Sequence, residues 1–386
     1  MIAEKYIRKA REWTSCPLSL LPKEILKRTI EVGVTSKEDE RAGTYIQIDH
    51  SVIQEAVKEA FKDKVEVMST GEALKKHKWL KKYWWKLIRE DQDEYTLLAK
   101  NMWDQGYFLR VHEGEKVTLP LQSCLMISTN NLNQNVHNII VAEPDSEAQI
   151  ITGCTVHPNV KAGLHVGISE FYIKEGAELT FTMIHSWAEN VEVRPRSAAL
   201  IEEDASFISN YVCLRPVKTL QTYPAAYCKG GNSRVRFNSL LYGTGISRID
   251  VGAKVVLEGE DSRGEVISRA IATEEADIHL RGLLIGKNSE SRAHLECRGL
   301  LLSEKAKIHA IPELLAESKG AELSHEAAIG KIAEEQILYL MSRGFSRRES
   351  ESLIIRGFMD VSILGLPEKL SKEIKGLIEV TAAQAL

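Results

Sequence analysis

Apolar residues recur at helical spacing in the first hundred residues, so residues 1–104 are predicted to form a helical region. Residues 51–54 make a capping-box signature, and a helical apolar face follows it (Val52, Ile53, Ala56, Val57, Ala60 and Phe61). A second helix is predicted to begin near Thr70. Its apolar stripe runs from Ala73 to Leu87, and most of its lysines lie off that stripe. This pattern favours a helix docked on the next domain over one that binds nucleic acid or a membrane surface.

The pattern changes near residue 105, where short β-rich runs begin to alternate with turns. Several turns place an alanine after an acidic residue or a glycine and before an apolar run (Ala148, Ala177, Ala205, Ala253, Ala276 and Ala321). Several successive alanines lie roughly 23 to 30 residues apart, a loose period that is typical of stacked β-solenoids. Helical spacing is almost absent here. Residues 105–324 are therefore predicted to form a right-handed parallel β-helix, with a β-sandwich as the alternative.

Helical spacing returns in residues 325–386, which are predicted to form a C-terminal helical region. A first helix is expected at residues 334–343, and Gly344 is a suitable residue to end it. Residues 345–349 combine an apolar residue with a capping box, so a second helix is expected to run through Ile355. The fold predicted for the whole chain is thus mainly β, with a β-helix core between helical ends.

Length and composition narrow the possible classes of protein. The 386 residues are enough for two or three domains, and a net charge of −4 gives no overall attraction to nucleic acid or anionic lipid. No apolar run approaches the roughly 18 residues that cross a bilayer, and the charged first residues do not read as a signal peptide. Six cysteines without a CxxC pair argue against a disulfide framework and fit a reducing compartment. We therefore expect a cytoplasmic protein with no nucleic-acid or membrane partner.

The richest set of candidate metal ligands lies between residues 291 and 345. The residues concerned are Cys297, His294, His309, His325 and Glu326. Cysteine, histidine and carboxylate are ligand types that suit iron and iron–sulfur clusters. These residues lie on separate short apolar runs, so only a fold that places those runs side by side could bring them together.

Two other motifs are incomplete in this stretch and are excluded. His325 and the glutamate after it begin a zinc-protease motif, but Ile329 occupies the position of the second histidine. A phosphate loop is suggested near residue 286, but Arg281 replaces its first glycine and Asn288 its magnesium-binding hydroxyl.

The same stretch resembles the C-terminal part of the SufB/SufD proteins, which are scaffold subunits of the SUF iron–sulfur assembly machine. In that family a cysteine is followed by GAH-x-x-P, by EHEA and by EDQLFY. Here the corresponding positions are Cys297, residues 307–312, residues 324–327 and residues 335–339. The separation of 28 residues between Cys297 and His325 matches the SufB spacing.

The resemblance extends over roughly residues 80–370, because residues 103–122 and 339–360 also follow the family pattern. Residues 153–158 resemble the SufB motif whose cysteine is the proposed entry point for sulfur, which makes Cys154 a candidate sulfur acceptor. The alternative is that Cys154 is a small buried core residue.

The resemblance implies a parallel β-helix and a scaffold, not an enzyme. It implies dimerisation through the β-helix end with a second SufB/SufD-type subunit, and docking of a SufC-like ABC ATPase through the C-terminal helices. A transient iron–sulfur cluster would be held by Cys297, His325 and Glu326, with His309 as a further metal ligand. The chain has no phosphate loop, so ATP hydrolysis would come from the partner.

Some positions depart from the SufB pattern. Met126 and Met183 stand where SufB is expected to have an arginine and a threonine that line an internal path for sulfur, and the length is nearer to SufD. Leu323 and Glu326, however, differ from the usual SufD residues. A SufD-like structural subunit that holds no cluster therefore stays open as an alternative, as does the choice between a homodimer and a heterodimer.

A carbohydrate-active β-helix enzyme would need acids gathered in one groove, whereas the acids here lie mainly at turns.

Overall fold

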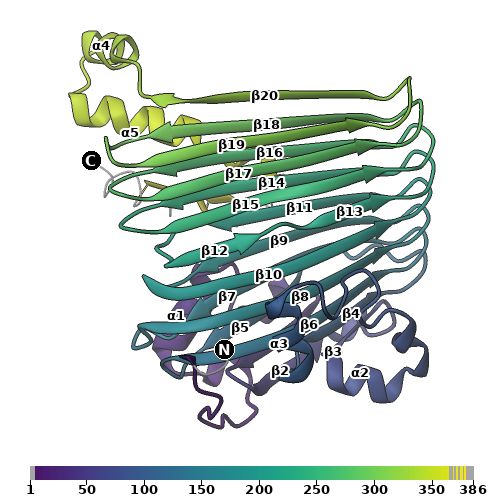
Figure 1. The fold of residues 1–386 in the computed structure, drawn as a ribbon. Helices are drawn as coiled ribbons and strands as arrows, with labels where there is room; N and C mark the ends of the chain where they lie inside the picture. Colours follow the sequence, from purple (N-terminus) through teal and green to yellow (C-terminus); the bar gives the residue numbers. More distant parts are fainter. Residues whose placement is uncertain (1–4, 365–367, 369–370, 373, 377, 380–386) are drawn as a thin grey trace.

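The computed structural model describes residues 5–364, 368, 371–372, 374–376 and 378–379, and these form a parallel β-helix with helices at both ends (Figure 1). The solenoid has about eight turns, and strand is the main secondary structure. The mainly β fold with flanking helices that the sequence predicts is therefore confirmed. Two large sheets face each other across a shared apolar core.

The strands of both sheets stack almost in sequence order along the solenoid. Sheet A contains β3 (Val65–Ser69), β4 (Tyr107–Val111), β6 (Leu132–Ala142), β8 (Ala162–Ile173), β10 (Asn190–Ile201), β12 (Thr219–Thr222), β13 (Ala225–Cys228), β15 (Arg248–Leu257), β17 (Asp277–Gly286) and β19 (Lys307–Ala316). Sheet B contains β1 (Gly43–Ile48), β2 (Ser51–Val57), β5 (Leu121–Ile127), β7 (Glu147–Val156), β9 (Glu178–Ser186), β11 (Ser206–Cys213), β14 (Arg234–Gly243), β16 (Arg263–Ala272), β18 (Arg292–Leu301) and β20 (Glu322–Lys331). Neighbouring strands are parallel, except for the antiparallel pairs β1–β2 and β3–β4.

The strand register gives the length of one coil. Glu147 pairs with Glu178, 31 residues later, and Ser206 pairs with Arg234, 28 residues later. Alternate residues of each strand point inward, and their apolar side chains form the main core. Three of the predicted turn alanines are fully buried: Ala177, Ala205 and Ala276. The turn predicted at residues 251–254 is wrong, because these residues lie inside β15.

The N-terminal region is only partly helical. Its helices are α1 (Lys23–Glu31), α2 (Thr70–Lys76) and α3 (Glu94–Asn101), with 3-10 segments η2 (Leu18–Leu20), η3 (Glu38–Glu40), η4 (Glu59–Phe61) and η5 (Lys78–Lys82). The helix predicted after residue 51 is wrong, because β2 occupies this place and pairs with β1 across a turn at Asp49, where φ is 52°. The apolar spacing here suits either a helix or a strand, and burial of Ile53 against the solenoid selects the strand.

The basic segment at residues 70–87 docks on sheet A as predicted, although it is not one continuous helix. The buried carboxylate of Glu170 on β8 accepts hydrogen bonds from the backbone N–H groups of residues 85–88, at 2.6–3.2 Å. The imidazole of His137 also hydrogen-bonds this carboxylate, at 2.9 Å, and stacks on Trp84. The lysines of the segment are exposed: Lys75, Lys78, Lys81, Lys82 and Lys86.

The C-terminal helices lie where the sequence predicts them. They are α4 (Glu334–Ser342) and α5 (Arg347–Phe358), and a 3-10 segment that was not predicted, η6 (Val361–Leu364), follows them. Gly344 follows α4 with a φ of 99°, and Ser346 and Glu349 form the predicted capping box at the start of α5. Ile355 and Met359 are buried in the apolar cluster on the outer face of sheet B, so α5 is fixed to the solenoid. Among the described residues, no helix combines the length and apolar character needed to span a bilayer.

Candidate functional site

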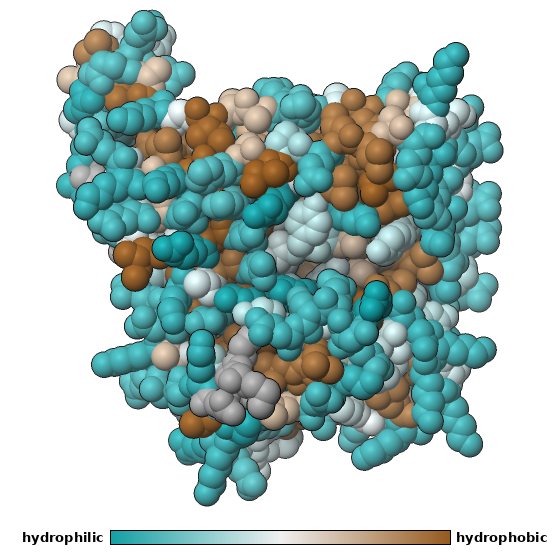
Figure 2. Space-filling view, viewed as in Figure 1, coloured by the Kyte–Doolittle hydropathy of each residue, from teal (hydrophilic) through white to brown (hydrophobic). Residues whose placement is uncertain are grey.

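The last coil of the solenoid, made of β19 and β20, is left uncovered. Within the described part of the chain, β19 pairs only with β17 and β20 only with β18, so each has one free edge of backbone N–H and C=O groups. Inward-facing residues are also exposed here, because Leu314 and Ile329 each keep 38% of their surface accessible. Figure 2 shows apolar surface at this end of the molecule, uppermost in the view. Such a surface is suited to contact with another protein.

Cys297 lies on β18, in the coil next to this uncovered end, and points into the solenoid. Its in-register neighbours are Ser268 on β16 and Ala327 on β20. Burial raises the pKa of the Cys297 thiol to about 11, and the nearby Glu296 carboxylate adds to the rise. At neutral pH the thiol is therefore protonated, and a bound metal must displace that proton.

His325 and Glu326 lie on β20, so the solenoid extends beyond the boundary predicted at residue 324. His325 pairs in register with the inward-facing Leu295 and therefore shares the inward side with Cys297. Glu326 is the next residue along the strand and points to the outer face. The strand pleat thus separates Glu326 from the other two predicted ligands within one chain.

On the outer face of sheet B, Glu326 lies beside His294 and Glu296 of β18. One ligand atom from each of these three residues lies within 4.8 Å of the others. His294 Nδ1 is 2.8 Å from Ser324 Oγ, and the Arg298 guanidinium is 2.9 Å from Glu296 and 3.7 Å from Glu326. Sequence reasoning did not select Glu296, although its two-residue spacing from His294 would place both on one face of a strand.

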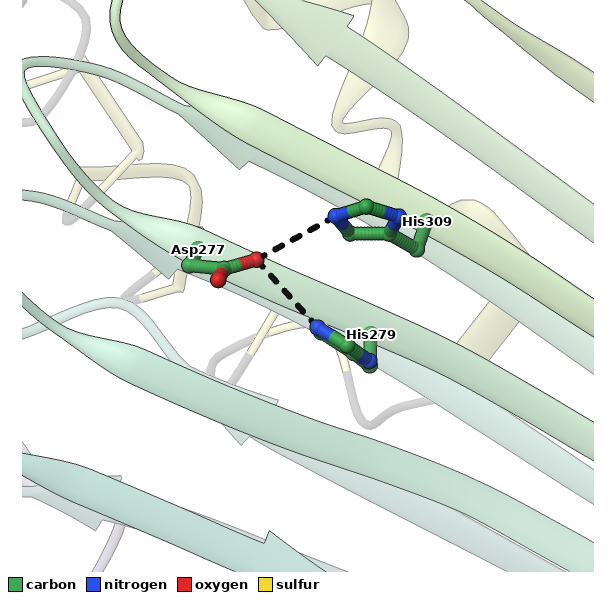
Figure 3. A group of neighbouring side chains, drawn as sticks. All are labelled: Asp277, His279 and His309. Carbon is green, nitrogen blue, oxygen red and sulfur yellow. Dashed lines mark ion pairs between the residues drawn. The ribbon is translucent and has the colours of Figure 1, made fainter.

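His309 belongs to a different part of the molecule from the other predicted ligands. It lies on β19, on the outer face of sheet A, beside Asp277 and His279 of β17 (Figure 3). Cys297 points inward from sheet B. The structure therefore places His309 apart from Cys297, against the grouping made from the sequence, and brings it instead to two residues that the sequence analysis did not select.

Cys154 lies on β7, points inward and is fully buried. Its in-register neighbours are Leu125 on β5 and His185 on β9. Burial raises the pKa of the Cys154 thiol well above its usual range and lowers the pKa of His185 well below its usual range. His165 on β8 is also buried, which lowers its pKa to about 3. The buried imidazole of His185 is therefore neutral and does not stabilise a thiolate at Cys154.

An interior cavity of about 50 Å³ lies between the coil of Cys154 and that of Cys297. Three of its lining residues, Tyr211, Ser239 and Ser268, occupy successive in-register positions that lead to Cys297. Five strand steps separate β7 from β18, a distance of about 24 Å at the usual strand spacing. The interior between the two cysteines is therefore partly polar and not fully filled.

Met126 and Met183, which stand where SufB is expected to line an internal path with an arginine and a threonine, lie on different sides of sheet B. Met183 borders the interior cavity. Met126 points outward into the apolar cluster that packs under the N-terminal segment, so this position does not line the interior of this chain.

The chain is similar to proteins of iron–sulfur cluster assembly over most of its length. A family model described as the SufBD core domain of SUF system FeS cluster assembly matches residues 125–358. An iron–sulfur cluster assembly SufBD family protein of Methanothermobacter thermautotrophicus is 46% identical over 365 residues, which cover 94% of this chain and 88% of the relative. A SufBD family protein of Archaeoglobus fulgidus is 49% identical over 360 residues, covering 93% and 96%. The iron–sulfur cluster assembly protein SufB of Bacillus subtilis is 28% identical over 380 residues, covering 96% and 80%.

Proposed function

Because the chain belongs to the SufBD family of iron–sulfur cluster assembly proteins, we propose that it is a scaffold subunit on which nascent clusters are held before transfer. In this role it binds and positions, and it does not itself hydrolyse ATP. The observation that carries the proposal is the uncovered last coil, where Cys297 and His325 share the inward side next to free strand edges.

The number of ligands requires a second subunit. Iron–sulfur clusters usually take four protein ligands, mostly thiolates, and each chain offers one cysteine at this end of the solenoid. A partner of the SufB/SufD type that covers the last coil would supply a second set. Ala327 is the inward residue between Cys297 and that partner, and its small side chain adds little bulk between them. Two thiolates with imidazole or carboxylate would hold iron weakly enough to release it.

The C-terminal helices are proposed to dock a SufC-like ABC ATPase. Ile355 anchors α5 on sheet B, whereas apolar side chains elsewhere on α4 and α5 remain in solvent. The exposed apolar residues are Leu338, Tyr339 and Met341 on α4, Leu353 on α5, and Phe345 in the link between the two helices. On α5, Leu353 and Gly357 are exposed, and Ile354 and Phe358 are half-buried, so these four residues form the proposed docking face. An apolar face held on a fixed helix suits helix-in-groove binding.

Cys154 is retained as the candidate sulfur acceptor, and the partly polar interior between it and Cys297 supports this role. Its burial means that a partner would have to open the coil before the thiol could react. All six cysteines are free, which agrees with the reducing cytoplasm that the proposal assumes.

One observation favours a second candidate function, that of a SufD-like structural subunit which holds no cluster. Glu326 lies on the opposite side of β20 from Cys297, so one chain does not present the complete predicted ligand set. In that case the uncovered coil would serve only to pair with a cluster-holding subunit.

Anaerobic reconstitution of the full chain with iron and sulfide tests the scaffold proposal. The parent protein should develop visible cluster absorbance, and Cys297→Ala should lose it. Cys228→Ala is a matched control, because Cys228 is also fully buried in the core and burial also raises its pKa, to about 12. Cluster absorbance in Cys297→Ala equal to that of Cys228→Ala would rule out Cys297 as a ligand and favour the structural subunit.

A further inference from the structure

Two histidines and an aspartate meet on the outer face of sheet A, on the opposite side of the solenoid wall from its core. Asp277 and His279 are two residues apart on β17, so their side chains share one face of the strand. His309 is the in-register neighbour of His279 on β19. Figure 3 shows both imidazole rings turned with one nitrogen toward the same carboxylate.

The distances within this group fit a metal ion. Asp277 Oδ1 is 3.3 Å from His279 Nε2 and 3.6 Å from His309 Nε2, and all three ligand atoms lie within 4.8 Å of one another. Metal–ligand bonds of about 2.0–2.2 Å place two ligands of one ion about 3.0–3.5 Å apart at angles near 90–110°. An ion could therefore bind between the three atoms with only small side-chain movements.

The protein itself does not satisfy the carboxylate oxygen at the centre of the group. Asp277 Oδ1 is buried and accepts no hydrogen bond, although buried carboxylate oxygens normally have a partner. The Nε2 atom of His279 faces this oxygen, and the Nδ1 atom of the same ring is buried without a hydrogen-bond partner. The two imidazole rings are held side by side, with centroids 4.5 Å apart. Three ligand atoms therefore converge on one point, and among the described residues none donates a hydrogen bond to Asp277 Oδ1 there.

The surroundings leave room for further ligands. Asp277 and His279 border an open groove of about 400 Å³. The groove is lined by three carboxylates and three guanidinium groups. One carboxylate, that of Asp250, forms a salt bridge with Arg281 at 2.5 Å. The groove as a whole therefore does not attract cations strongly, and the affinity must come from the donor atoms. Water or a small anion could complete the coordination from the groove.

We propose that Asp277, His279 and His309 bind one divalent first-row transition ion such as Fe²⁺ or Zn²⁺. Two imidazoles with one carboxylate and open positions are a ligand set that such ions prefer, whereas Mg²⁺ and Ca²⁺ prefer oxygen ligands. The site is separate from Cys297, which points inward from the other sheet, and it does not depend on the scaffold role.

Cobalt titration of the metal-free full chain tests this site, because Co²⁺ replaces Zn²⁺ or Fe²⁺ and its visible absorption reports the ligand geometry. The parent and Cys297→Ala should both bind Co²⁺ at this site. His279→Gln and His309→Gln should each weaken that binding by on the order of 100-fold or more, since even the loss of an outer-shell partner costs 10–100-fold. The matched control is His294→Gln, which removes a histidine of the group on sheet B and should leave the cobalt affinity of the Asp277 site unchanged.

Folding of the variants is checked by thermal unfolding in chelator, where midpoints should stay close to that of the parent because the side chains of His309 and His279 are 49% and 33% exposed. If a histidine variant misfolds, Zn²⁺-induced shifts of the His279 and His309 imidazole resonances in the parent provide the second measurement. Absence of Co²⁺ binding at millimolar concentration would overturn the proposal. So would an unchanged cobalt affinity in folded His279→Gln and His309→Gln, or Zn²⁺ shifts confined to other histidines.

Discussion

Replacing Ile329 with lysine should break the pairing of the uncovered last coil with a second subunit. Ile329 faces inward on β20 and keeps 38% of its surface exposed, so a partner that covers the end must bury it. Full burial of an isoleucine stabilises by about 1.5–3 kcal/mol, and the exposed fraction therefore accounts for roughly 0.6–1.1 kcal/mol per copy. In a symmetric dimer each side chain counts twice, which gives about 1–2 kcal/mol.

Replacing Ile329 with alanine or with lysine should weaken the dimer to different extents. Ile329→Ala removes only the apolar contribution. Because about 1.4 kcal/mol corresponds to a tenfold change in the dissociation constant, this substitution should weaken a homodimer by roughly 5–30-fold. Ile329→Lys adds the cost of desolvating an unpaired charge in each copy, which is several kcal/mol. Its dimer should therefore be weakened by more than about 100-fold.

Sedimentation equilibrium of the full chain over a dilution series measures both effects. Ile30→Lys is a matched control, because Ile30 on α1 is also an isoleucine and is 37% exposed, but lies near the other end of the molecule. The parent and Ile30→Lys should share one dimer dissociation constant. The reasoning is refuted if Ile329→Lys dimerises as tightly as the parent, or if Ile30→Lys weakens the dimer equally. A parent chain that stays monomeric alone but pairs with a paralogue would indicate a heterodimer. The substitution then occurs in only one of the two subunits, so the binding free energy that it removes is halved.

Two further predictions concern docking and thiol chemistry. Leu338→Asp on α4 should abolish co-purification with the ABC ATPase, because Leu338 lies on the proposed docking helices. The control Leu97→Asp should not, because Leu97 is 47% exposed but lies on α3. Equal binding by both variants would count against the assignment. Because burial raises the pKa of Cys297 to about 11, only about 0.1% of it is thiolate at pH 8, and its alkylation should rise about tenfold per pH unit up to pH 11. Mass spectrometry should find both Cys297 and the buried Cys154 far slower to react than the half-buried Cys16, and rapid labelling of Cys154 at pH 7 would contradict the buried environment described above.

Local signals in the sequence predicted the elements that depend on neighbouring residues. The capping box at Ser346 and the glycine at position 344 mark where α5 begins and α4 ends, because helix termini are satisfied by groups a few residues away. Where a pattern suits two structures, the local signal was not sufficient. Residues 51–57 could form a helix or a strand, and pairing with β1 decided for the strand.

In the candidate site, too, some features follow from the sequence alone and others follow only from the fold. From residue types and spacing, the sequence by itself determined that the chain is a β-solenoid with helical ends and that Cys297 and His325, close to one coil apart, could meet. Only the tertiary structure decided which face each side chain takes, because one residue along a strand reverses its direction. The pleat turned Glu326 away from Cys297, and stacking of the coils carried His309 to Asp277 and His279 on the other sheet. These contacts depend on the strand register between coils about thirty residues apart, and a slip of one residue in that register would move every side chain to the other face.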